Sequence, residues 1–223
     1  MAIDYTKSPG GSEGSGGQSG GQSGGTVSLT KTAPSVSLTK QESESGILRV
    51  NLNWNSRPGK GGLFKRSTAI DLDLGCLYEY ADGSKGVVQA LGNAFNDRHS
   101  FGGTPIVRLD GDDRSGTNTA GENLFVDLTE PARINRILVF ALIYDGVPNW
   151  AEADGVVSVY PASGRTFDVR LEEGNPRARM CGIAMIANNG GNLTITRENR
   201  YVSGHQELDQ AYGWGLRWTA GRK

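Results

Sequence analysis

The sequence repeatedly alternates apolar and polar residues with a period of two. The clearest run spans residues 70–80, where the even-numbered residues are apolar, whereas Asp71, Asp73 and Glu79 occupy odd positions. Successive side chains of a β-strand point to opposite faces, so this run predicts a strand with one apolar and one largely polar face. A period of two offers a helix no continuous apolar stripe, and it therefore favours a chain built from sheets.

Runs of a similar kind recur along the rest of the chain. Strands are expected at residues 27–31, 36–40, 50–55, 70–80, 86–91, 105–109, 123–128, 136–144, 155–160, 165–171, 179–187 and 192–201. Asp82-Gly83 and the run from Asn188 to Gly191 are turn signals. The run at 136–144 is largely apolar on both faces, which predicts a central strand. One short helix is expected at 205–212.

Glycine separates the chain into a tail and a body. Ser8 to Gly25 hold nine of the 33 glycines together with five serines, a composition that cannot bury apolar surface. We therefore expect a disordered tail at residues 1–25 and a single domain at 26–223. Many short strands in about 198 residues predict an all-β fold, an antiparallel β-sandwich with at most one or two short helices.

Charge and targeting signals restrict the possible partners and location. The net charge is −1, from 23 basic and 24 acidic residues, which lacks the electrostatic footprint of a nucleic-acid-binding protein. The first residues lack the basic and apolar regions of a secretory signal. Cys76 and Cys181 form no CxxC motif and are expected to be reduced thiols. These features predict a cytoplasmic protein.

Two acidic segments offer oxygen ligands for a metal ion. Asp71 and Asp73 lie on one strand face, about 6.6–7 Å apart by strand rise. The segment 110–123 adds four further carboxylates and several glycines; its candidate ligands are Asp110, Asp112, Asp113 and Glu122. Calcium takes six to eight oxygen ligands in irregular geometry, so these two segments could together supply a calcium site. An acidic, glycine-rich segment is also typical of a solvated turn, and the residues alone leave both interpretations open. An EF-hand is excluded, because Arg114, Ser115 and Gly121 occupy its diagnostic positions.

The same motifs resemble the TerD family of bacterial tellurium-resistance and stress proteins. The resemblance extends over about residues 26–218, and the pairing of DLDL with GDDRSG about forty residues later is its most specific part. The motifs that carry it are Val27-Ser-Leu-Thr-Lys31, Asn51-Leu-Asn-Trp54, Asp71-Leu-Asp-Leu-Gly75, Gly111-Asp-Asp-Arg-Ser-Gly116 and Asn149-Trp150.

The resemblance implies a calcium-binding β-sandwich that works without catalysis in tellurium resistance and the general stress response. It implies partners from the same operon, in cytoplasmic complexes or complexes at the inner face of the membrane. The implied ligands are Asp71, Asp73, Asp112, Asp113 and the carbonyl of Gly116. Where many members have a dense acidic run, this chain has Thr119-Ala-Gly-Glu-Asn123, so we expect weaker calcium binding.

Two other classes of function remain open from the sequence. Cys76 could give the protein a redox or enzymatic role on stress metabolites or tellurium oxyanions, although its place among leucines favours packing. The tail could instead tether a purely structural assembly module. A serine hydrolase is disfavoured, because GxSxG occurs only within the tail, where no strand and helix flank the serine.

Overall fold

The computed structural model describes residues 35–37, 46–54, 70–98, 104–111, 121–162 and 166–219. The expected tail, the strand expected at 27–31 and the end of the strand expected at 36–40 lie outside these residues. The elements in chain order are β1 (Ser35–Ser37), β2 (Ile47–Asn53), β3 (Asp71–Tyr80), β4 (Lys85–Gln89), η1 (Leu91–Asn93), β5 (Val107–Leu109), β6 (Glu122–Asp127), η2 (Pro131–Arg133), β7 (Ile134–Asp145), α1 (Trp150–Ala153), β8 (Gly155–Tyr160), β9 (Phe167–Leu171), β10 (Met180–Asn189), β11 (Asn192–Val202) and α2 (His205–Tyr212).

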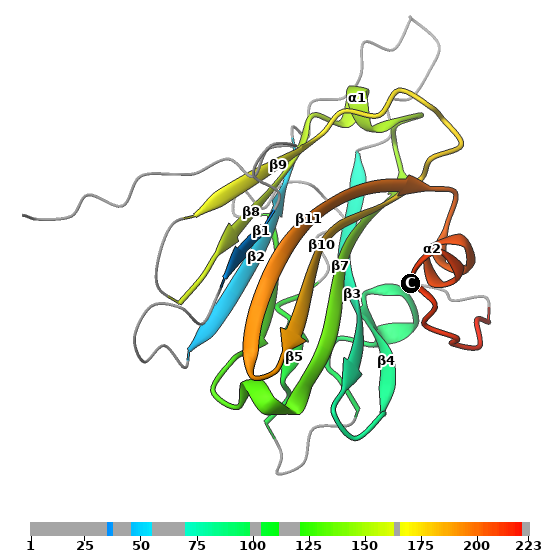
Figure 1. Cartoon of the computed structure of the whole chain (residues 1–223). Coiled ribbons are helices and arrows are strands. Elements are labelled where there is room, and N and C mark those ends of the chain that lie inside the picture. Colours follow the sequence, from blue (N-terminus) through cyan, green and yellow to red (C-terminus); the bar gives the residue numbers. More distant parts are fainter. Residues whose placement is uncertain are drawn as a thin grey trace, which may run out of the picture.

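The described strands form two antiparallel sheets that pack face to face (Figure 1). The six-stranded sheet has the order β1-β11-β10-β7-β3-β4, and the five-stranded sheet has the order β5-β6-β2-β8-β9. The apolar strand β7 lies between β10 and β3, which confirms the predicted central strand. The fold is therefore the predicted antiparallel β-sandwich.

Apolar side chains from the inner faces of both sheets form the main core. On β3, the even-numbered residues from Leu72 to Tyr80 belong to this core, as the alternation predicts. Trp54 fixes the end of β2 against the opposite sheet, because its indole Nε1 donates to the carbonyl of Ile70 at 3.0 Å. This bond joins the two sheets just before β3 begins.

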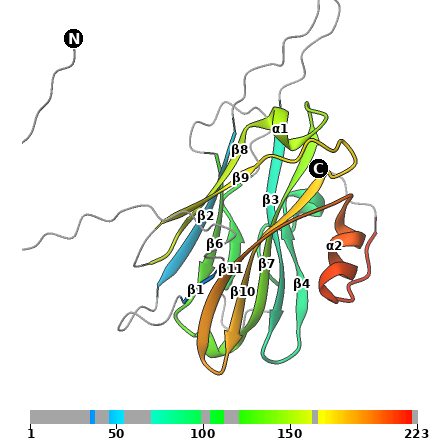
Figure 2. The same cartoon turned by 45° about the horizontal axis from the view of Figure 1, so that its top comes forward.

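A second apolar cluster lies on the outer face of the six-stranded sheet. Leu77 and Phe140 of the sheet pack there with Leu208 of α2 and with Trp214, which follows the helix. Figure 2, a second view of the fold, shows α2 beside β4. The aromatic C-terminal segment thus covers this outer face and forms a second core with it.

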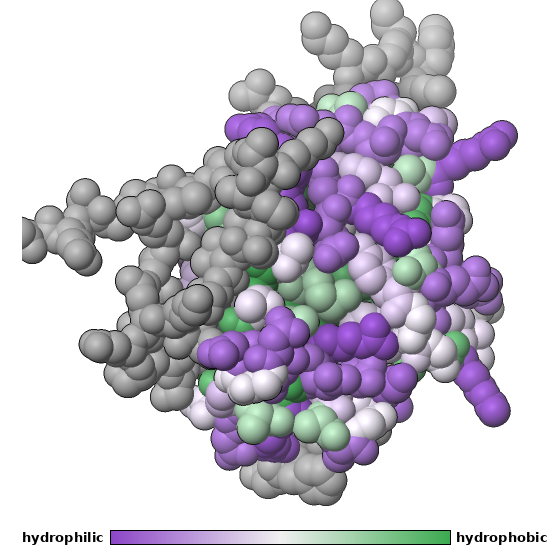
Figure 3. All heavy atoms as spheres, viewed as in Figure 1, coloured by the Kyte–Doolittle hydropathy of each residue, from purple (hydrophilic) through white to green (hydrophobic). Residues whose placement is uncertain are grey.

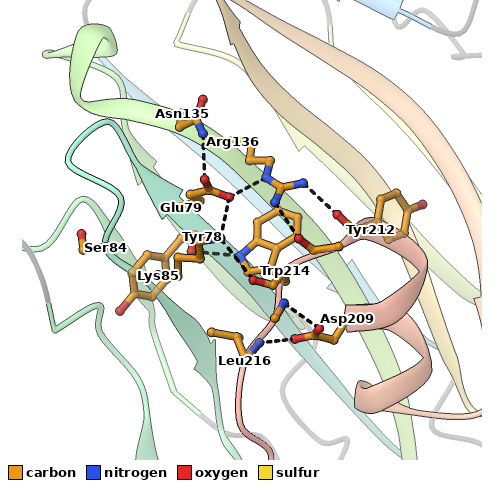
Figure 4. A network of polar contacts seen from close by, with 12 residues as sticks. Tyr78, Glu79, Ser84, Lys85, Asn135, Arg136, Asp209, Tyr212, Trp214 and Leu216 are labelled. Atoms are coloured by element: carbon orange, nitrogen blue, oxygen red, sulfur yellow. Dashed lines mark hydrogen bonds and ion pairs between the residues drawn. The ribbon is translucent and has the colours of Figure 1, made fainter.

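Polar contacts hold this cap in place (Figure 4). The Arg136 guanidinium lies over the Trp214 ring, 4.0 Å from its centroid, and Nη1 donates to the carbonyl of Tyr212 at 2.8 Å. Glu79 Oε2 accepts from Arg136 Nε at 2.7 Å. A cation at the C-terminus of a helix also interacts favourably with the helix dipole. The outer face of β3 is therefore partly closed by the residues that follow β11.

The described surface is mainly polar. On the face shown in Figure 3, hydrophilic residues surround a small hydrophobic area. Among the described residues, Ile47 and Tyr144 are the large hydrophobic side chains with substantial exposure, at 46% and 43%. Most large hydrophobic side chains in the described parts of the chain are therefore at least partly buried.

Several elements differ from the expectations. The strand expected from Val50 begins at Ile47, and the 3-10 helices η1 and η2 and the helix α1 at Trp150–Ala153 were not expected. Four residues are too few for an amphipathic period, but Asn149 is a recognisable N-cap: its side chain accepts from the amide of Glu152 at 3.0 Å. Trp150 is buried in the core and donates from Nε1 to the carbonyl of Ala178 at 2.7 Å.

Candidate metal centre

The two aspartates of the DLDL motif lie at the start of β3. Asp71 pairs with Asp145 of β7, and Asp73 pairs with Leu142. Asp71 is only 8% exposed and Asp73 only 1% exposed. Strand β4 pairs with β3 from Gly75 onwards, so the edge of β3 next to these aspartates lies beyond the end of β4. The two buried carboxylates therefore lie on the part of β3 that precedes its pairing with β4.

Glu122 comes from the opposite sheet and reaches this edge. It is 1% exposed, and its Oε2 accepts from the amide of Leu74 at 2.8 Å, one residue beyond Asp73. Residue 122 has the same parity as the core residues Leu124 and Val126 of β6, so its side chain points inward between the sheets. The loop that ends at Glu122 is thus connected to the strand segment that carries Asp73.

Gly121 allows the chain to enter β6 in this position. Its φ is +68°, a conformation that L-residues with side chains rarely adopt. A Cβ at this position would also collide with the carbonyl oxygen of Leu52, which pairs with Glu122 across β2 and β6. Glycine is therefore required for the loop to approach β2 closely enough to orient Glu122.

Asp110 has a different environment from Glu122. Its two carboxylate oxygens accept from the amide of Asn123 at 3.0 Å and from Asn123 Nδ2 at 2.6 Å. Asn51 Nδ2 donates to Asn123 Oδ1 at 3.0 Å, which continues the network onto β2. Asn123 follows Glu122 and therefore faces the outer side of the sheet. These bonds hold Asp110 next to Asn123, on either side of the segment 111–121, and the role of Asp110 as a ligand stays a prediction.

These amide contacts were not anticipated from the sequence. The alternation of Asn51 with Leu52 and of Asn123 with Leu124 indicates only that both asparagines face away from the core. Their pairing depends on the register of β2 with β6, which joins residues more than seventy positions apart. The alternation within each strand restricts which side chains share a face, but it does not identify β6 as the partner of β2.

The described residues supply only part of the predicted ligand set. Asp112, Asp113 and Gly116 lie outside the described residues, whereas Asp71, Asp73, Asp110 and Glu122 lie within them. Across the described parts of the chain, no group of three or more histidine, cysteine, aspartate or glutamate residues is arranged to hold a metal ion. The buried members of the predicted ligand set are Asp71, Asp73 and Glu122. Their carboxylate oxygens are the hard ligands that calcium prefers.

Both cysteine thiols are buried in the core. Cys76 and Cys181 are each 0% exposed, and burial raises the pKa of both thiols above the usual range. A thiolate is the reactive form of cysteine, so these environments suppress thiol chemistry. This geometry favours the packing role for Cys76 over the redox role left open from the sequence.

Comparison with known proteins connects the chain to tellurium resistance. Over 201 residues it is 45% identical to the tellurium resistance protein TerA of an Alcaligenes species. The match covers 88% of this chain and 58% of that relative, so the chain spans little more than half of the relative's length. No protein-family model matches the chain.

Two solved structures share the fold. One is a homologue of the telluride resistance protein TerD from Streptomyces coelicolor A3(2), with a TM-score of 0.53 and 19% identity over 73% of this chain and 94% of that chain. The other is a protein of unknown function, with a TM-score of 0.53 and 13% identity over 73% of this chain and 93% of that chain. At these identities the likeness concerns the fold alone.

The described helices are short. None of them has the length and apolar character that a membrane-crossing helix needs.

Proposed function

Since the chain belongs to the tellurium resistance (Ter) protein family, we propose that it is a non-enzymatic calcium-binding protein. Calcium would connect the start of β3 with the loop that leads into β6. The ordered loop would then form part of a surface that other proteins of the tellurium-resistance and stress-response system recognise. The proposed location is the cytoplasm, including complexes at the inner face of the membrane.

The observation that supports this proposal is the contact between Glu122 and β3. The bond from the Leu74 amide to Glu122 Oε2 places the end of the acidic loop beside the two-aspartate segment, although the two lie on different sheets. Burial of a carboxylate is unfavourable unless hydrogen bonds or a cation compensate for the lost water. Asp71 and Asp73 are both buried at the start of β3, which suits a cation at this end of the sandwich.

Each predicted ligand would contribute in a defined way. Asp71 and Asp73 would offer carboxylates from a strand held by β7, whereas Asp112, Asp113 and the Gly116 carbonyl would come from the loop. When bound, the ion would supply a positive charge that offsets the negative charge of the aspartates that hold it. Glu122 would mainly hold the start of β6 against β3, because its Oε2 already accepts a hydrogen bond from the Leu74 amide. Asp110 would hold the residues on either side of segment 111–121 together through its hydrogen bonds with Asn123.

Thermal melting with calcium, magnesium or EDTA tests the proposal. A ligand that binds only the native state adds about 2.7 kcal/mol at a hundredfold excess over its dissociation constant. We expect calcium to raise the melting temperature, and we expect Asp71→Asn with Asp73→Asn to remove that rise. Glu130→Gln is the matched control, because Glu130 is exposed and precedes the start of β7, at the opposite end of β3 from Asp71. A melting temperature that millimolar calcium leaves unchanged would refute the proposal.

A further inference from the structure

Strand β9 lies at one margin of the five-stranded sheet (Figure 1). It pairs with β8 on one side, and none of the described strands pairs with its other edge. An edge strand presents backbone donors and acceptors that can pair with another strand.

The sequence of β9 is self-complementary in an antiparallel arrangement. Its residues are Phe167, Asp168, Val169, Arg170 and Leu171. If two copies meet with Val169 opposite Val169, each Asp168 lies opposite Arg170 of the second copy. Phe167 likewise lies opposite Leu171. A two-fold axis through this strand pair thus repeats every contact twice.

The two faces of β9 suit this arrangement. Phe167, Val169 and Leu171 are each 1% exposed and belong to the core, so their inner face would continue across the two copies. Arg170 is exposed on the outer face, and Asp168 is half-buried beside Ser158, whose hydroxyl donates to Asp168 Oδ1 at 2.6 Å. The contact between Arg170 and Asp154 is long, at 3.9 Å, and both side chains are about two-thirds exposed. Such a surface ion pair is weak and leaves Arg170 available for a second carboxylate.

We propose that β9 is a homodimer interface, in which two copies of this chain pair antiparallel through β9 and join their five-stranded sheets. Opposite charges directly across an antiparallel pair stabilise it, and like charges destabilise it. The partner is therefore selected by the order of charges along β9. A pair of five-residue strands buries little surface, so we expect a weak dimer with a dissociation constant in the micromolar to millimolar range.

Charge reversal gives a sharp test. Asp168→Arg and Arg170→Asp each place like charges opposite one another at two positions of the homodimer. We expect each variant alone to raise the dissociation constant roughly tenfold to a hundredfold. In a mixture, the two arginines of the Asp168→Arg chain face the two aspartates of the Arg170→Asp chain. The mixture is therefore expected to form a heterodimer of about native affinity.

Sedimentation equilibrium of the full chain measures these constants over a wide concentration range, for the native protein, each variant and the equimolar mixture. Circular dichroism melting establishes that each variant is folded, and Glu130→Arg serves as a charge reversal away from β9. Dimers of the native chain, their loss in both variants and their return in the mixture support the proposal. A native chain that remains monomeric at millimolar concentration would overturn it. Dimers that both variants retain, or a mixture that stays monomeric, would equally overturn it.

Discussion

The buried carboxylate of Asp209 is predicted to hold the C-terminal segment on the sandwich. Its Oδ1 accepts from the amide of Gly215 at 2.8 Å, and its Oδ2 accepts from the amide of Leu216 at 2.9 Å and from Trp218 Nε1 at 3.0 Å. Figure 4 shows the position of Asp209 beside Leu216. Asp209 is 6% exposed, so Asp209→Ala would remove three hydrogen bonds from a site with little water.

The expected cost of Asp209→Ala follows from these contacts. A hydrogen bond to a charged group contributes about 1.5–3 kcal/mol. Three such bonds are offset by the cost of burying the carboxylate, and the released donors are only partly buried, so we expect a loss of about 3 kcal/mol. For a chain of this size, that loss lowers the melting temperature by roughly 6–12 °C.

Urea and thermal unfolding would measure this loss. Gln210→Ala is the matched control, because Gln210 is an exposed neighbour on the same helix and its alanine variant is expected to lie within about 0.5 kcal/mol of the native protein. Trp218→Phe removes one of the three donors. Combined with Asp209→Ala in a double-mutant cycle, it should lower the free energy of unfolding by less than the sum of the two single losses. An Asp209→Ala protein as stable as the control would refute the role given to this carboxylate.

Three further predictions concern single residues. Gly121→Ala is expected to destabilise the protein by about 2 kcal/mol or more in urea unfolding, because a Cβ at φ +68° would collide with the Leu52 carbonyl; native-like stability would contradict this. Cys76 and Cys181 are expected to resist a thiol-specific reagent in the folded protein and to react fully in urea, and rapid labelling of folded protein would contradict their burial. Burial lowers the pKa of His205 to about 4, so the unfolded chain binds the extra proton between pH 6.5 and 4 and stability falls as the pH drops through that range. Relative to His205→Gln, the native protein should lose about 1–2 kcal/mol between pH 7 and pH 5, and equal losses in both would exclude His205 as the cause.

The sequence predicts local structure well where a run alternates clearly. The residues from Leu72 to Tyr80 show why: one face of β3 is apolar over its whole length, so the strand and its buried face follow from the period alone. The central position of β7 follows from apolar residues on both of its faces. The turns at Gly83 and at Gly190 and Gly191 have the positive φ values that their glycines suggest.

Long-range placement could not be predicted in the same way. The bond between Glu122 and the Leu74 amide forms because β3 and β6 lie in different sheets that pack against each other. The sequence around Leu74 does not indicate that β6 packs nearby, and the sequence around Glu122 does not indicate β3. Glu122 contacts β3 whereas the next residue, Asn123, contacts Asp110, because consecutive residues of β6 point to opposite faces of the sheet. The acidic segments identified candidate ligands by residue type, but the partners of each carboxylate arise only from the fold.

Calorimetric titration of the metal-free protein with calcium tests the central proposal most directly, because it measures the stoichiometry and the affinity together. We predict saturable binding in the native protein and in Glu130→Gln, and its loss when Asp71→Asn and Asp73→Asn are combined. Absence of calcium binding to the folded native protein, or binding of unchanged affinity in the doubly substituted protein, would contradict a calcium site at the start of β3.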